Sequence, residues 1–153
     1  MVKKNVIKAG MFAAFAIYVI LVIKLLFLQH RGTWSDLSMS EYALFQINLV
    51  PFKTILEYIT AFFKDSMNTS IPVKNLVGNF VLFMPMGLFL PYLIKWINSI
   101  KKYLLLISLI LILLEAIQFI TKRGAFDIDD YILNISGALI GYLIIKRFFH
   151  KLR

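Results

Sequence analysis

Long apolar segments alternate with polar stretches along the chain, and four of these segments are long enough to consider as membrane spans. A helix that crosses the hydrocarbon core of a bilayer needs about 20 predominantly apolar residues. The pattern therefore predicts transmembrane helices at about residues 9–28, 76–94, 103–120 and 126–145. We expect an all-α fold in a single domain, residues 1–153: a polytopic membrane helical bundle of four transmembrane helices plus an outer amphipathic helix.

The additional helix is predicted in the long loop between the first two spans, residues 29–74. Over residues 53–64, apolar side chains recur at helical spacing between charged ones, which predicts an amphipathic helix at the membrane surface. Residues 41–63 are also long enough for a fifth span, and a re-entrant segment is a further option. A surface location is favoured because polar residues and a proline interrupt this stretch: Glu41, Gln46, Asn48, Pro51, Lys53 and Glu57.

Composition excludes an ordinary soluble domain. Hydrophobic residues make up 60% of the chain and the mean hydropathy is +0.80, whereas about 45–50% apolar residues is usual for soluble proteins. The chain has no cysteine, so neither a disulfide nor a thiolate metal site can form. Lysines precede the first span, but Leu26–His30 offers no small-x-small cleavage site, and we expect a retained helix rather than a signal peptide.

The distribution of charge predicts the orientation of the bundle. The net charge is +9, and of the 17 Lys and Arg residues ten lie on the side of the two termini, whereas none of the eight Asp and Glu residues does. Because positively charged loops tend to stay in the cytoplasm, we expect a multi-pass membrane protein with both termini cytoplasmic. No basic helix or basic patch remains for nucleic acid, so no nucleic-acid partner is expected.

Amide and acid side chains lie just inside the same end of three predicted spans. A polar group in hydrocarbon is costly and usually faces a partner, a cavity or a substrate. Asn79, Glu115 and Asn134 all lie about 6–8 Å below the outer edge at the helical rise, which predicts one polar pocket in the outer leaflet. Ordinary hydrogen bonding between helices is the alternative. The predicted ligand-binding residues are Asn75, Asn79, Glu115, Gln118, Arg123, Asp127, Asp130 and Asn134.

Two further features predict how the helices run and pack. Pro85 removes a backbone hydrogen bond, so a kink or break is expected near Met84–Gly87. The fourth span needs more length than its apolar core provides, and we expect its helix to extend back through Asp127–Asp130. Gly137 and Gly141, four residues apart on the same face, permit close contact with another helix.

The chain resembles the VanZ-like family of small bacterial membrane proteins. The resemblance covers roughly residues 45–145, and it rests on an ordered set of motifs rather than on any one of them. The motifs are Asn48-Leu49-x-Pro51-Phe52, Asn79-x-x-x-Phe83-x-Pro85-x-Gly87, Glu115-x-x-Gln118-Phe119 and Gly124-x-x-Asp127-Ile128-x-Asp130-x-x-x-Asn134-x-x-Gly137. The resemblance implies a cell-envelope protein linked to lowered sensitivity to teicoplanin, a glycopeptide that binds cell-wall precursors, and to glycopeptides with a lipid tail. It carries over no catalytic residue.

Three classes of function remain open. In the first, a non-enzymatic envelope factor binds a membrane lipid head group, a lipid-linked cell-wall precursor or the acyl tail of a lipoglycopeptide, and no cofactor is expected. In the second, a membrane enzyme acts on a lipid phosphate or ester, with catalytic candidates Glu115, Asp127 and Asp130, and Arg123 as a phosphate ligand. In the third, the chain is a structural bundle or a transporter subunit, and a four-span transporter requires a homo-oligomer.

Metal binding is expected only under the enzyme hypothesis. Asp127, Asp129 and Asp130 supply oxygen ligands of the kind that Mg²⁺ prefers. The short acidic pattern has many chance matches. A histidine zinc site is not expected, because His30 and His150 lie on opposite sides of the predicted membrane.

Overall fold

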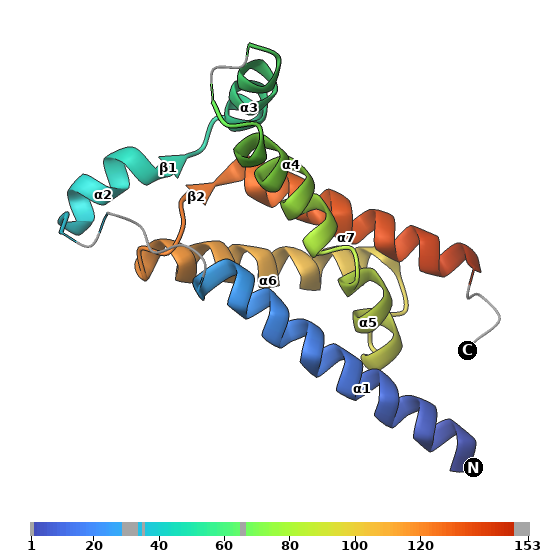
Figure 1. Cartoon of the computed structure of the whole chain (residues 1–153). Helices are drawn as coiled ribbons and strands as arrows, with labels where there is room; N and C mark the ends of the chain where they lie inside the picture. The colour runs from blue at the N-terminus through green and yellow to red at the C-terminus, as the bar shows by residue number, and fades with distance from the viewer. Residues whose placement is uncertain (1, 29–33, 35, 65–66, 149–153) are drawn as a thin grey trace.

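The computed structural model describes residues 2–28, 34, 36–64 and 67–148, and it consists almost entirely of helices (Figure 1). His30 and His150 lie outside the described residues. The elements are α1 (Val2–Ile23) with its π-helical continuation η1 (Lys24–Leu28), α2 (Met39–Gln46), β1 (Ile47–Asn48), α3 (Lys53–Phe63), α4 (Ser70–Leu82), α5 (Met86–Leu93), α6 (Ile100–Ile120), β2 (Phe126–Asp127) and α7 (Ile128–Phe148). The all-α prediction is confirmed.

Among the described residues, four helical segments are long and apolar enough to cross a membrane: Asn5–Leu28, Ser70–Leu93, Ile100–Ile120 and Ile128–Arg147. They coincide with the four predicted spans, although the second begins six residues earlier than predicted. The beginning of α1, the connection from α5 to α6 and the end of α7 lie at one end of the molecule (Figure 1). The short elements α2, β1, β2 and α3 gather at the other end.

The second span is broken at the predicted place. α4 ends at Leu82 and α5 begins at Met86, with Pro85 immediately before it. The Met86 amide donates to Phe83 at 3.1 Å, so the Leu82 carbonyl lacks the partner that a continuous α-helix would give it. The Tyr18 hydroxyl of α1 donates to this carbonyl instead, at 2.7 Å. The break is thus satisfied by a side chain from another span, as expected in a hydrocarbon environment.

α7 packs directly on the backbone of this broken span. A Cβ atom added at Gly137 would lie 1.8 Å from the Phe80 carbonyl oxygen, and one added at Gly141 would lie 2.1 Å from the Met84 carbonyl oxygen. No real side chain fits at such distances, so both positions require glycine while this packing is kept. The close contact predicted from the Gly137 and Gly141 spacing is confirmed.

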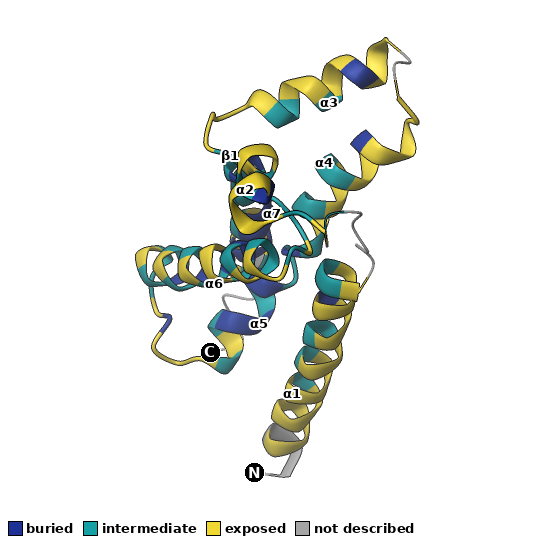
Figure 2. Ribbon diagram, turned by 90° about the vertical axis from the view of Figure 1, so that its left-hand side faces the viewer, coloured by how far each residue is buried: buried dark blue, intermediate teal, exposed yellow. Residues whose placement is uncertain are grey.

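The buried core joins α5, α6 and α7. Tyr103 of α6 is fully buried, stacks on Tyr142 of α7 with ring centroids 4.5 Å apart, and donates its hydroxyl hydrogen to the Ala138 carbonyl at 2.9 Å. The outward faces of α1 and α3 are largely exposed in Figure 2 and carry many large apolar side chains. Such surfaces are costly in water and suit contact with lipid.

Residues 41–63 do not form a fifth span. They contain the end of α2, then β1, then α3, and the two helices of eight and 11 residues are too short to cross a bilayer. α3 agrees with the predicted amphipathic helix at 53–64. Neither α2 nor β1 was predicted. β1 pairs in parallel with β2, with Asn48 opposite Asp127, so a two-residue strand connects this stretch to the beginning of α7.

The expectation that the fourth helix includes Asp127 is wrong. Asp127 lies in β2, and α7 begins one residue later at Ile128. The Asp127 Oδ1 atom accepts a hydrogen bond from the Asp129 amide at 2.8 Å. An Asp side chain that accepts from an amide in the first helical turn is an N-cap, and this interaction stops the helix from extending further back.

Candidate functional site

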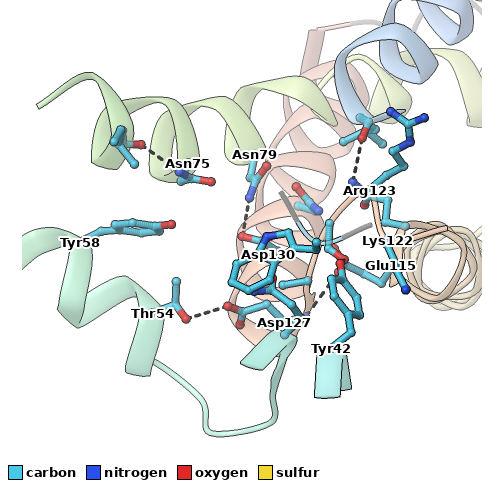
Figure 3. A pocket seen from close by; sticks show the side chains of 18 residues that line it. Tyr42, Thr54, Tyr58, Asn75, Asn79, Glu115, Lys122, Arg123, Asp127 and Asp130 are labelled. Carbon is cyan, nitrogen blue, oxygen red and sulfur yellow. Dashed lines mark hydrogen bonds between the residues drawn. The ribbon is translucent and has the colours of Figure 1, made fainter. Parts of the chain in front are cut away.

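A cavity of about 370 Å³ opens at the end of the bundle where β1 and β2 pair (Figure 3). Its walls come from α2, α3, α4, α6, α7, η1, β2 and the α6–β2 connection. All eight residues predicted to bind a ligand line it. The complete lining is Leu26, Trp34, Tyr42, Gln46, Thr54, Tyr58, Ile71, Asn75, Asn79, Glu115, Gln118, Lys122, Arg123, Gly124, Ala125, Asp127, Asp130 and Asn134.

One wall of the cavity is formed by α4 and α7. The Asn79 side-chain amide donates to Asp130 Oδ1 at 2.5 Å, which joins the two helices about two turns of α7 before the contact at Gly137. Asn75, one turn before Asn79, donates to the Ile71 carbonyl of its own helix at 3.0 Å. Asn79 is therefore a cross-helix contact, whereas the NH₂ group of Asn75 is used within α4.

Asp127 is the centre of a hydrogen-bond network below the cavity. Its Oδ1 atom accepts from the Asn48 side-chain amide at 2.9 Å, and its Oδ2 atom accepts from the Thr54 hydroxyl at 2.7 Å. Its own amide donates to Glu115 Oε2 at 3.5 Å. A buried carboxylate is stable only with such partners, and both Asp127 oxygens are already occupied by groups of β1, α3 and α7.

Asp129 does not line the cavity. Its side chain is 1% exposed, and its two oxygens accept from the backbone amides of Phe52 at 2.5 Å and Ile55 at 3.2 Å. Phe52 has a φ angle of 65°, in the left-handed region, immediately before α3. Asp129 therefore satisfies the free amides at the beginning of α3, where a negative charge is also favoured by the helix dipole.

The three aspartates proposed for Mg²⁺ consequently do not converge. Asp129 faces the α3 turn, and the Asp127 oxygens are taken by protein donors. Within the described ranges, no group of three or more His, Asp and Glu side chains is placed to hold a metal ion.

The opposite wall is formed by the end of α6 and the turn that follows. The Gln118 side-chain amide donates to the Leu26 carbonyl of η1 at 3.2 Å, and the Tyr42 hydroxyl donates to the Gly124 carbonyl at 2.8 Å. Lys122, whose φ angle is 51°, donates to the Leu37 carbonyl. The first span and α2 are thus attached to the site through backbone carbonyls.

The cavity is rich in carboxyl groups. Glu115, Asp127 and Asp130 line it from α6, β2 and α7, and the cations Lys122 and Arg123 line it from the turn above α6. Glu115 and Asp127 are 6% and 7% exposed. Tyr58 of α3 also lines the cavity. Burial raises its pKa, and Asp130, Asp127 and Glu57 act in the same direction, so Tyr58 remains a neutral hydroxyl that can donate a hydrogen bond.

Asn134 lies one helical turn beyond Asp130 on α7 and is 4% exposed. Its Oδ1 atom is buried and has no hydrogen-bond partner among the described residues. A buried acceptor without a donor is costly. The Asn134 Oδ1 atom is therefore an acceptor in the cavity wall whose hydrogen bond is not supplied by the described residues.

Several site residues were not predicted from the sequence, namely Trp34, Tyr42, Gln46, Thr54 and Tyr58. They come from the long loop predicted at residues 29–74 and from its amphipathic helix. Asn48, which holds Asp127, belongs to the first family motif and could have been suggested on that basis. Thr54 carries no sequence signal, because its role depends on a contact with a residue 73 positions away.

The fold and the site define the class of the protein. It is a four-span helical membrane protein with a cavity at one end that is lined by acidic and amide side chains. The chain belongs to the VanZ/LLP1 family, whose model matches residues 15–150. It is 30% identical over 126 residues to Protein VanZ of Enterococcus faecium, an alignment that covers 82% of this chain and 67% of that protein. The resemblance seen in the sequence is confirmed. No solved structure matches the chain.

Proposed function

We propose that this protein is a cell-envelope factor that lowers sensitivity to teicoplanin and other glycopeptides with a lipid tail, by binding an amphiphile in the cavity. The main support for this proposal is that side chains from α4, α6 and α7 converge on one cavity of about 370 Å³. Polar groups are costly in a membrane, so a cavity that gathers eight predicted polar residues is better explained by a ligand than by helix packing alone.

The cavity has the chemical character of a head-group site. Its amides and carboxyls suit a polar group, while Leu26 of η1 and Ile71 of α4 supply apolar lining. Ile71 is 45% exposed, so it borders both the cavity and the apolar exterior. An acyl chain attached to a bound head group can leave past this residue into lipid. A membrane lipid, a lipid-linked wall precursor and a lipoglycopeptide share this combination of polar head and apolar tail.

The charge distribution supports an orientation with both termini in the cytoplasm. The connection from α5 to α6, the beginning of α6 and the end of α7 lie at the end of the bundle away from β1 and β2 (Figure 1). Five basic residues belong to these segments: Lys95, Lys101, Lys102, Lys146 and Arg147. In this orientation the cavity opens in the outer leaflet, where wall precursors and glycopeptides meet.

Teicoplanin susceptibility tests the proposal. In a susceptible strain, expression of the wild-type chain should raise the inhibitory concentration of teicoplanin and reduce binding of a fluorescent derivative. Glu115→Ala should lose both effects, because Glu115 is buried in the cavity wall. Ser136→Ala is the matched control, since its hydroxyl bonds only to the Ile132 carbonyl of its own helix. Unchanged susceptibility and antibiotic binding with the wild-type chain, at matched membrane levels, would show the proposal to be wrong.

A second candidate function is a membrane enzyme that acts on a lipid phosphate or ester. It is favoured by one observation, which is that the Glu115 and Asp130 carboxyls line the same cavity and so offer two acid–base groups. Purified protein in detergent should then turn over a phospholipid or lipid-phosphate substrate, and Glu115→Gln should abolish turnover. A broad substrate panel with no turnover, with Mg²⁺ or with EDTA, would count against this candidate.

A further inference from the structure

The hydrogen-bonding capacity of the cavity is unevenly distributed. At its α6 and α7 side, Glu115, Asp130 and Asn134 present acceptor oxygens, and we call these three residues the acceptor cluster. Asp130 uses Oδ1 for Asn79, and Glu115 uses Oε2 for the Asp127 amide at the long distance of 3.5 Å. The second oxygen of each carboxyl is left to accept from a ligand.

Asn134 adds an independent observation. Only 4% of its surface is exposed, and it lines the cavity. Its Oδ1 atom has no hydrogen-bond partner among the described residues. Two carboxyls that only keep a helix bundle together would not need a third, unsatisfied acceptor beside them. A buried acceptor of this kind is commonly completed by a ligand or an ordered water.

We propose that the acceptor cluster binds a primary ammonium group on the head of an amphiphile. An ammonium has three N–H donors and no acceptor, and it is positively charged. It therefore matches three converging acceptors that belong to two acids and one amide. This assignment rests on the proposed function, and it specifies which part of the amphiphile enters the cavity first.

A divalent cation is the competing occupant of the same oxygens. Ca²⁺ takes about six to eight oxygen ligands, waters included, and Mg²⁺ keeps several waters and is bound through one or two carboxylates. Asp127, a third carboxyl in the cavity lining, has both oxygens bonded to Asn48, Thr54 and the Asp129 amide. Within the described residues no group of three or more His, Asp and Glu side chains is placed to hold a metal ion, and two carboxyls beside an unpartnered amide oxygen match the three donors of an ammonium.

Two sources can supply the ammonium: the ethanolamine head of a phospholipid and the lysine side chain of a wall peptide. Matched probes separate them. Short-chain phosphatidylethanolamine is compared with short-chain phosphatidylcholine, whose nitrogen carries no hydrogen. A lysine-containing peptide is compared with the same peptide acetylated at Nε. All four are titrated against the full chain purified in detergent.

Tryptophan fluorescence can report binding. The chain has two tryptophans, Trp34 in the cavity wall and the exposed Trp96 in the connection between α5 and α6. In a Trp96→Phe background, the signal comes from Trp34 alone. At least one free-amine probe should change this signal saturably and bind at least about tenfold more tightly than its blocked partner, as expected for the loss of charged hydrogen bonds.

Variants locate the binding group. Glu115→Gln removes a charge at constant size, and Asn134→Leu replaces the amide by an apolar group of similar volume. Each should weaken binding of the free-amine probe by about tenfold and leave the blocked probe unchanged. Ser136→Ala, a neighbour on α7 whose hydroxyl bonds within the helix, should change neither.

The remaining outcomes decide against the ammonium site in different ways. Equal binding of the free and blocked probes, unaffected by Glu115→Gln and Asn134→Leu, would overturn the ammonium site and leave amphiphile binding intact. A saturable response to Mg²⁺ alone, removed by EDTA, would assign the oxygens to a metal ion. Lack of response to all four probes would also overturn the ammonium site, while teicoplanin susceptibility would still test the proposed function separately.

Discussion

The Thr54 hydroxyl donates to Asp127 Oδ2 at 2.7 Å, across 73 positions of sequence. This contact joins the amphipathic helix α3 to the residue that caps α7, and the same Thr54 oxygen also accepts from the Asn48 side chain at 3.0 Å. One hydroxyl group therefore holds together β1, α3 and the distant residue that precedes α7. The cavity wall depends on a residue that a hydropathy pattern presents as part of a surface helix.

Thr54→Val should destabilise the protein by about 1–3 kcal/mol, because it leaves one oxygen of a buried carboxyl without its donor at nearly constant side-chain volume. Thermal unfolding in detergent, followed by circular dichroism, measures the effect. Thr60→Val is the matched control, since Thr60 lies on the same helix and is exposed. Equal unfolding temperatures for the two variants would show that the Thr54 contact is not important for stability.

Asp129→Ala should release the beginning of α3 from α7. The substitution removes the acceptors of the Phe52 and Ile55 amides, so these amides should exchange their hydrogens with solvent faster. Hydrogen exchange followed by mass spectrometry measures this change in the peptide that covers residues 50–58. Glu57→Ala, an exposed acid on the same helix, should leave exchange near Phe52 unchanged. Slow exchange in both variants would contradict the capping role of Asp129.

Gly137→Ala should destabilise the bundle by about 1–3 kcal/mol, the usual cost of forcing extra volume into a packed interior. Its Cβ would meet the Phe80 carbonyl oxygen, a backbone atom that cannot rotate away. Gly78→Ala introduces the same methyl group on α4 with no atom within 4 Å, and it should be neutral or slightly stabilising because alanine favours a helix. Thermal unfolding of both variants should separate them clearly, and similar values would argue against tight packing of α7 on α4.

Single cysteines can establish the orientation, because the natural chain has none. Met67→Cys lies at the cavity end and should react in intact cells with a membrane-impermeant maleimide. Asn98→Cys lies in the connection between α5 and α6 and should react only after the cells are permeabilised. Both positions are exposed. The reverse labelling pattern would place the cavity on the cytoplasmic side.

The spans were predictable because a bilayer imposes a length of apolar sequence on each crossing helix. The break at Pro85 was equally predictable, since proline removes a hydrogen bond from its own helix whatever the rest of the fold. The convergence of Asn79, Glu115 and Asn134 followed from the cost of polar groups in lipid. The free-energy cost of burying polar groups in lipid predicts that they lie near one another, but it does not predict which groups bond. The structure shows, for example, that Asn79 bonds to Asp130.

The acidic run before α7 shows what sequence reasoning missed. Asp127, Asp129 and Asp130 look like one cluster in the sequence, yet they have three different surroundings. Asp127 is held by Asn48 and Thr54, Asp129 by the α3 backbone, and Asp130 by Asn79. The position of Asp127 depends on β1, a strand of two residues, and so short an element leaves no periodic pattern from which to predict it.

The seam between α7 and the broken span has a consequence for how mutations should be interpreted. Gly137 lies seven residues beyond Asp130, about 10 Å along the helix, and it does not line the cavity. Yet α4 and α7 cannot be spread apart at Gly137 without also altering the separation of Asn79 and Asp130 in the cavity wall. If a substitution of Gly137 abolishes activity, the reason would therefore be the width of the binding site. That width depends on how closely α4 and α7 pack at a position that has no side chain.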